Sequence, residues 1–201
     1  MRKLDYCGAI REAMFQEMER DDSVFVYGIG VPNWSSIFGT TKGFVEKFGK
    51  ERCFDTPISE DAMTGFGLGA AISGLRPIHV HIRVDFMLLA TNQLINLVSN
   101  YSYSTGGKHK VPLVIRAIIG RGWGQGAQHS KSMFSNFTHI PGLKVIALTD
   151  HDTDLGWPEA INNLPANLQL VLGCEFSALD SRGKSVHILG LLFDNQNQKN
   201  R

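Results

Sequence analysis

Strand-like and helical segments alternate from the start of the chain to Leu148, and this order constrains the fold more than any other feature. Short apolar runs bounded by glycine or polar residues are typical of buried strands, and longer stretches with apolar residues every three or four positions are typical of helices. Their alternation predicts a parallel sheet that is covered by helices on both faces. The expected strands are 24–28, 76–81, 111–116 and 143–148, and the expected helices are 4–20, 41–48, 59–73 and 86–104.

The character of the sequence changes after Leu148, where a dense polar cluster, Thr149-Asp-His-Asp-Thr153, follows. The fold class that we expect is therefore α/β: a parallel sheet flanked by helices over residues 1–146, with a short α/β C-terminal appendage over 147–201. In the appendage we expect a short helix at 158–164 and two strands, 168–174 and 185–193, joined by a turn at 180–183.

Charge and composition exclude several classes of partner. The 201 residues carry a formal net charge of +1, so no electrostatic footprint predicts binding to nucleic acid or to an acidic membrane surface. No window approaches the roughly 18 apolar residues of a membrane span, and the charged start, Met1-Arg-Lys-Leu-Asp5, lacks the apolar core of a signal peptide. The three widely spaced cysteines suggest free thiols in a reducing compartment, so we expect a cytoplasmic protein.

An acidic residue opens the most unusual of the expected helices. Ser59 is suited to cap the helix, and Glu60 falls in its first turn. Gly65, Gly67 and Gly69 each disfavour an isolated helix by roughly 1 kcal/mol, which predicts that something packs closely against this helix. From the residues alone, Glu60 would merely decorate an exposed first turn, as most glutamates at such positions do.

The motif around Glu60 makes the chain recognisable. The string Asp55-Thr-Pro-Ile-Ser-Glu60, with Gly65-Phe-Gly-Leu-Gly-Ala-Ala71 and Gly74-Leu-Arg-Pro77 after it, resembles the beta subunits of the decarboxylating components of 2-oxo acid dehydrogenases. More broadly, it resembles the pyrimidine-binding domain of transketolase-like enzymes. The similarity continues in family order through Asp85-Phe86, Asn92-Gln-Leu-Ile-Asn96, Tyr103-Ser-Thr-Gly-Gly107, Pro112-Leu-Val-Ile-Arg116, Gly126-Ala-Gln-His-Ser130 and His139-Ile-Pro-Gly-Leu-Lys-Val145.

This resemblance implies thiamine diphosphate as the cofactor and a role for three residues. Glu60 matches the glutamate that hydrogen-bonds the aminopyrimidine ring and favours the imino tautomer, whose nitrogen then removes a proton from the thiazolium carbon. Phe86 matches the residue whose ring stacks on the aminopyrimidine, and His129 matches a histidine near the substrate carboxylate. Without the family, Phe86 could equally be core packing, and His129 could be a structural or solvated histidine.

The sequence departs from the family in ways that imply a partner. Asn92 stands where the family usually has aspartate, and Leu89 stands where it has a polar residue, which puts substrate choice and turnover in question. The Gly-Asp-Gly…Asn signature that holds the diphosphate and its magnesium is absent. The resemblance therefore implies an alpha-type partner subunit that carries the diphosphate-binding domain, a homo- or hetero-oligomer that is inactive as this chain alone, and a small 2-oxo acid as substrate.

The C-terminal part resembles something else. The stretches Val145 to Thr153, Gly173-Cys-Glu175 and Val186 to Gly190 resemble part of a PHP-type metal-dependent phosphoesterase, and His151, Glu175 and His187 match its metal ligands. Imidazole and carboxylate ligands suit zinc, manganese or iron. The opening His-x-His and the closing Asp-x-His motifs of that family are missing. A phosphoesterase that uses these residues is the alternative hypothesis, and a non-catalytic hybrid or truncated subunit is the third.

Overall fold

The computed structural model describes residues 6–33, 37–119, 126–131, 133, 135–144, 147–151, 171–179 and 185–192. The chain divides into two compact units, residues 1–133 with 140–142 and residues 134–139 with 143–201, and each is described by itself. In the described part of the chain, no helix is long and apolar enough to cross a membrane.

The first unit contains the predicted parallel sheet. Its strands lie in the order β2-β1-β3-β4, and every neighbouring pair is parallel. The expectation of a parallel α/β sheet is therefore confirmed. The strands are β1 (Val24–Tyr27), β2 (Cys53–Phe54), β3 (Arg76–His81) and β4 (Val114–Ala117). Strand β2 escaped the sequence analysis because two residues are too few to show a periodic pattern.

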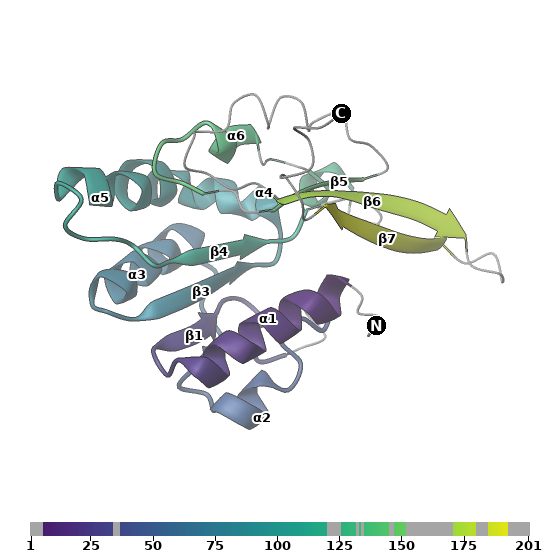
Figure 1. The fold of residues 1–201 in the computed structure, drawn as a ribbon, viewed down its shortest axis with the longest axis horizontal. Coiled ribbons are helices and arrows are strands. Elements are labelled where there is room, and N and C mark those ends of the chain that lie inside the picture. The colour runs from purple at the N-terminus through teal and green to yellow at the C-terminus, as the bar shows by residue number, and fades with distance from the viewer. Residues whose placement is uncertain are drawn as a thin grey trace, which may run out of the picture. The chain divides into compact units, whose positions relative to one another are not determined.

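Helices cover both faces of this sheet (Figure 1). Helices α1 (Tyr6–Arg20) and α2 (Phe44–Phe48) lie on one side, and α3 (Glu60–Ile72) lies on the other. Helix α2 begins at Phe44 instead of Thr41, because Gly43 at its N-terminus has a φ of 83° and the Thr41 hydroxyl donates to the carbonyl of Val31 (2.8 Å).

The strand residues divide into two sets that face different layers. Val24 and Val26 of β1 and Ile78 and Val80 of β3 form one buried cluster with side chains of α1 and α2. Because alternate residues of a strand face opposite sides, the intervening residues face α3. These are aromatic: Phe25 and Tyr27 of β1 contact Phe66 of α3 at ring-centroid distances of 6.3 and 5.3 Å, and His79 of β3 stacks on Tyr27.

The segment expected to be one helix at 86–104 is helical from Val84 to Ser104, so that prediction is confirmed, but the type of helix changes along the segment. Hydroxyl groups compete for backbone carbonyls here: Thr91 donates to Leu88 (2.6 Å) and Ser99 donates to Ile95 (2.5 Å). The elements are α4 (Val84–Met87), a 3₁₀ turn η2 (Leu88–Ala90), a π-helical stretch η3 (Gln93–Val98) and α5 (Ser99–Ser104).

The second unit contains a separate sheet in the order β5-β6-β7, in which β5 pairs parallel to β6 and β6 pairs antiparallel to β7. The strand expected at 143–148 is β5 and belongs to this sheet, because its partner is β6, which corrects its assignment to the first sheet. The elements are α6 (Ser135–Thr138), β5 (Ala147–His151), β6 (Val171–Leu179) and β7 (Ser185–Leu192). The helix expected at 158–164 and the turn at 180–183 lie outside the described residues.

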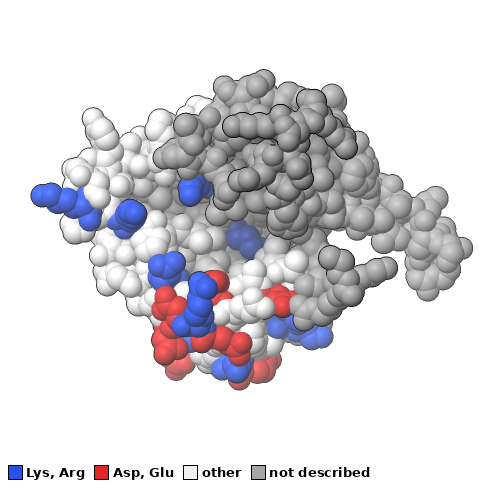
Figure 2. Space-filling view, in the orientation of Figure 1, with Lys and Arg blue, Asp and Glu red and all other residues white. Residues whose placement is uncertain are grey.

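Charged side chains of both signs gather over α1 and α2 (Figure 2). Several of them pair: Lys47 lies 3.0 Å from Glu19, and Arg52 lies 3.2 Å from Asp22. The Arg52 guanidinium also donates hydrogen bonds to the backbone carbonyls of Met18, Asp21 and Val24. These hydrogen bonds connect the end of α1 to the start of β1. This part of the surface mixes the two signs instead of presenting one.

The glycines of α3 do allow close packing, as the sequence predicts, but at two positions of three. A Cβ atom at Gly67 would overlap the hydroxyl of Tyr27 and lie 3.0 Å from Cδ1 of Leu113. A Cβ at Gly65 would lie 3.2 Å from Oε1 of Gln93, whereas a Cβ at Gly69 would meet nothing within 4 Å among the described residues. The prediction that something packs closely against this helix is therefore confirmed, and the close contacts are at Gly65 and Gly67.

This difference provides a matched pair of substitutions in one helix. Gly67→Ala should lower the free energy of unfolding by about 1–3 kcal/mol, because the added methyl displaces the buried Tyr27 ring. Gly69→Ala should instead raise it by up to about 1 kcal/mol, because alanine favours a helix and the site has room. Urea unfolding followed by circular dichroism measures both. Equal effects of the two substitutions would contradict the packing described for Gly67.

Candidate functional site

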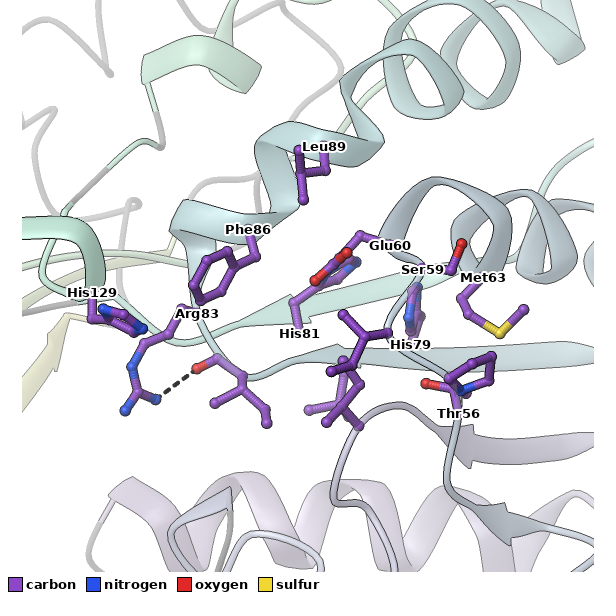
Figure 3. A pocket seen from close by; sticks show the side chains of 15 residues that line it. Thr56, Ser59, Glu60, Met63, His79, His81, Arg83, Phe86, Leu89 and His129 are labelled. Atoms are coloured by element: carbon purple, nitrogen blue, oxygen red, sulfur yellow. Dashed lines mark hydrogen bonds between the residues drawn. The ribbon is translucent and has the colours of Figure 1, made fainter. Parts of the chain in front are cut away.

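The ends of three strands and the start of α3 surround a cavity of about 470 Å³. In parallel sheets, ligands bind outside the carboxyl ends of the strands, and this cavity lies at that edge. Its lining includes Ile29 after β1, Thr56 after β2, and Ile82 and Arg83 after β3, together with residues of α3, α4 and the 126–131 segment. Figure 3 shows these side chains around the cavity.

Two features hold the strand ends together at this edge. Gly28 follows β1 with a φ of 146°, and a Cβ atom there would overlap the carbonyl oxygen of Val80, so only glycine allows β1 and β3 to approach so closely. The Asp55 carboxylate then accepts hydrogen bonds from the backbone N–H groups of Gly30 (2.9 Å) and Thr56 (2.8 Å). The loops after β1 and β2 are thereby joined beside the cavity.

Glu60 is the first residue of α3, is half-buried and lines the cavity. Ser59 occupies the N-cap position, as predicted, but its side chain makes no capping hydrogen bond. A residue of the sheet positions the helix start instead: the hydroxyl of Tyr27 in β1 donates a hydrogen bond to the carbonyl of Met63 in the first turn of α3 (2.8 Å). Burial raises the pKa of Tyr27 above its usual value, so the hydroxyl stays a donor.

Phe86 and His129 come from distant segments and meet at the same cavity. Their ring centroids lie 5.2 Å apart at an interplanar angle of 76°. A second contact joins the same two segments, because the Lys131 ammonium lies 3.3 Å from the carboxylate of Asp85, the residue before Phe86. Phe86 is 37% exposed, so its ring is not part of the core. The structure thus brings Glu60, Phe86 and His129 to one cavity, while their chemical roles stay predictions.

Two histidines that the sequence analysis did not select also line this cavity. His79 and His81 of β3 are buried, and their ring centroids lie 4.2 Å apart. Burial lowers the pKa of His81 to about 4, and burial together with the neighbouring His81 lowers the pKa of His79 to about 3. The sequence did contain a signal for these two residues: histidines alternate with apolar residues within a segment that is expected to be a buried strand.

The two departures from the family pattern lie in different places. Leu89 is 63% exposed and lines the cavity. An apolar side chain therefore lines the cavity where the family usually has a polar one. Asn92 is not among the cavity-lining residues, and its side-chain oxygen accepts a hydrogen bond from Asn96 (2.9 Å). Only the first of the two departures therefore alters the surface that a ligand in this cavity would meet.

The predicted C-terminal metal ligands are placed by the backbone register alone. His151 of β5 pairs with Glu175 of β6, and Glu175 pairs with Leu189 of β7, two positions from His187. Their side chains lie outside the described part, so the metal site stays a prediction. Where side chains are described, no group of three or more His, Cys, Asp or Glu residues could hold a metal ion.

Comparison with known proteins identifies the class to which this architecture and this cavity belong. The family described as "Transketolase, pyrimidine binding domain" matches residues 2–166. The chain therefore belongs to the transketolase pyrimidine-binding domain family, as the motifs around Glu60 indicate. His151 lies inside the matched range, and Glu175 and His187 lie beyond it.

Several relatives are similar over most of this chain. The "Pyruvate dehydrogenase E1 component subunit beta" of Chaetosphaeridium globosum is 45% identical over 139 residues, which cover 69% of this chain and 43% of the relative. The "Acetoin:2,6-dichlorophenolindophenol oxidoreductase subunit beta" of Cupriavidus necator is 42% identical over 163 residues, 76% of this chain and 48% of the relative. A chloroplastic beta-4 subunit of rice pyruvate dehydrogenase E1 is 44% identical over 139 residues, 69% of this chain and 35% of the relative. The chain thus spans less than half the length of these relatives.

The low pKa values of the two cavity histidines predict how stability changes with pH. In the unfolded chain both histidines take up protons as the pH falls through about 6.5, whereas in the folded chain they stay neutral down to a pH of about 4. Their full contribution is therefore present above pH 6.5, and it is lost as the pH falls toward 4. The loss approaches about 1.4 kcal/mol per pH unit for each histidine.

Urea unfolding between pH 7 and pH 5 tests this, because most carboxylates stay ionised in that window. The wild-type chain should lose stability more steeply than a His79→Phe/His81→Phe double variant, whatever the stability of the variant at pH 7. Parallel pH profiles for the two proteins would mean that these histidines titrate as exposed ones do.

Proposed function

We propose that this chain is the pyrimidine-binding, beta-type subunit of a thiamine-diphosphate-dependent enzyme acting on a 2-oxo acid, of the dehydrogenase, decarboxylase or transketolase-like kind. The observation that carries this proposal is the convergence of Glu60, Phe86 and His129 on one cavity at the carboxyl edge of the sheet. These residues come from three separate segments, so their meeting depends on the fold. Membership of the transketolase pyrimidine-binding family supports the same assignment.

The chemistry of the cavity fits the aminopyrimidine part of the cofactor. It offers a carboxyl group, Glu60, to form a hydrogen bond with the ring nitrogen, and an exposed aromatic face, Phe86, to stack on the ring. Much of the remaining lining is apolar, as in most cofactor sites, and includes Ile29, Ile58 and Met63. Buried imidazole nitrogens of His81 and His129 without hydrogen-bond partners in the described part point to a polar ligand.

In this proposal each residue has a limited task. When bound, thiamine diphosphate supplies the carbanion that attacks the 2-oxo acid. Glu60 holds a proton at the pyrimidine ring nitrogen, and the bond from Tyr27 to Met63 keeps the first turn of α3 where the carboxylate needs to be. Phe86 would orient the ring by stacking, and His129, whose Nδ1 atom is buried without a partner among the described residues, would contact the substrate.

The proposal requires a second subunit. An alpha-type partner would hold the diphosphate and its magnesium, and the two subunits would form a hetero-oligomer around the shared cofactor. The relatives named as beta subunits support this part of the proposal. A cytoplasmic location stays a prediction, since some relatives are chloroplastic by name. A transition metal at His151, Glu175 and His187 is a separate proposal that metal analysis of the full chain would test.

Glu60→Gln tests the proposed role directly, because the amide keeps the size of the side chain and removes its proton affinity. In the complex with the diphosphate-binding subunit, the variant should exchange the thiazolium proton of the cofactor for deuterium about 10²–10⁴ times more slowly than the wild type. Asp61→Asn is the matched control: Asp61 lies in the same helical turn, is exposed, and is not a cavity-lining residue. Its exchange rate should stay close to that of the wild type.

Rapid exchange in the Glu60→Gln complex would contradict the proposal, provided that circular dichroism shows the variant folded. Equal slowing by both substitutions would also contradict it, because the effect would then come from the charge of the helix start and not from contact with the cofactor.

A further inference from the structure

Strand β3 carries two kinds of residue on its two faces. Ile78 and Val80 face the apolar cluster shared with α1 and α2, whereas His79 and His81 face α3 and are also buried. An apolar residue at either histidine position would fill the space without the cost of removing a polar ring from water. The fold itself therefore does not explain why both positions are histidine.

The contacts of His79 account for its place in the structure. Its ring stacks on Tyr27 with centroids 4.4 Å apart and an interplanar angle of 9°. Its Nδ1 atom lies 3.4 Å from the hydroxyl of Thr64 in α3. The His81 ring contacts the His79 ring in turn, with centroids 4.2 Å apart and the ring planes tilted by 48°, so His79 packs against one side of His81.

His81 differs from His79 because one of its ring nitrogens has no hydrogen-bond partner among the described residues. The residue is 4% exposed, and Nε2 is buried without a hydrogen-bond partner among the described residues. Buried polar atoms nearly always have a partner, so one without a partner in a cavity wall points to a ligand. Figure 3 shows His81 in the cavity that Glu60 and Phe86 also line.

We propose that His81 is a specificity-determining residue, whose Nε2 hydrogen-bonds a hydroxyl group on the side chain of the 2-oxo acid substrate. The inference rests on the proposed function and adds to it the class of substrate, a hydroxylated 2-oxo acid in preference to an aliphatic one of the same size. His129 is a separate contact with an unpartnered Nδ1 atom in the same cavity.

A hydroxyl group suits this position because it can serve either protonation pattern of the neutral His81 ring. Desolvation lowers the pKa of His81 to about 4, so its ring is neutral near pH 7 and has one donor nitrogen and one acceptor nitrogen. A hydroxyl both donates and accepts, so it can bond to Nε2 in either tautomer. An aliphatic side chain would leave Nε2 buried and unpaired, and sites built around a hydrogen bond discriminate strongly against such analogues.

Two isosteric substrates test the inference in the complex of the full chain with its diphosphate-binding subunit. These are 2-oxopentanoate and the analogue in which a hydroxyl replaces its terminal methyl. The wild type should have the higher kcat/KM for the hydroxylated acid. His81→Phe, which keeps a ring against His79, should reduce this preference by about tenfold or more. His81→Gln, which can place an amide near the position of Nε2, should retain most of it.

A matched control and a direct measurement accompany the kinetics. His109→Phe makes the same chemical change at an exposed histidine that is not among the cavity-lining residues, and the preference should not change. In the wild-type complex labelled with ¹⁵N-histidine, the hydroxylated acid should shift the Nε2 signal of His81. The methyl isostere should shift it much less.

The possible failures are distinguishable. An unchanged preference in His81→Phe, or a wild type that prefers the methyl compound, overturns the inference alone. A His81→Phe complex that binds thiamine diphosphate more weakly but keeps the preference also overturns it, because His81 would then contact the cofactor. If the wild-type complex turns over neither acid, the inference fails, whereas the proposed function fails only if the Glu60→Gln complex exchanges the thiazolium proton as fast as the wild type.

Discussion

The hydroxyl of Tyr27 reaches the backbone of α3, and the position of Glu60 depends on this contact. The hydroxyl donates to the carbonyl of Met63 in the first turn of the helix (2.8 Å), and the missing side chain of Gly67 makes room for it. A glycine that weakens the isolated helix is thus needed for its docking. The capping side chain of Ser59 does not take over this role, so the sheet and not the cap determines where the acidic side chain lies.

The sequence predicted those parts of the fold whose signal is local. Strands β1 and β3 and helix α3 show clear periodicity, and the structure confirms them. Strand β2 has only two residues, and it forms because β1 offers it a partner, which no local pattern reveals. The changes of helix type within 84–104 were equally hidden, since the apolar spacing is helical and only the hydroxyl-to-carbonyl hydrogen bonds of Thr91 and Ser99 accompany them.

The candidate site was predictable to the extent that family motifs name its residues. Glu60, Phe86 and His129 are motif positions, so the resemblance could select them before their meeting in one cavity was known. The resemblance could not show which departure from the family pattern affects the cavity, because Leu89 and Asn92 are near each other in sequence. In the structure, only Leu89 of the two lines the cavity. Whether a departure bears on a ligand is decided by which side of a helical segment it occupies, and this segment is not a regular helix.

Neither local sequence patterns nor the family resemblance selected His79 and His81, which are polar residues on a buried strand. In β3 the alternation of Ile78, His79, Val80 and His81 resembles a strand with one apolar and one solvated face, yet both faces are covered. Polar residues on a covered face reduce stability unless each finds a partner, and natural proteins keep such conflicts mainly at functional sites. His79 resolves the conflict within the fold, through Tyr27 and Thr64. His81 has no such partner for its Nε2 atom among the described residues, and the proposed contact with a substrate hydroxyl rests on this difference between the two histidines.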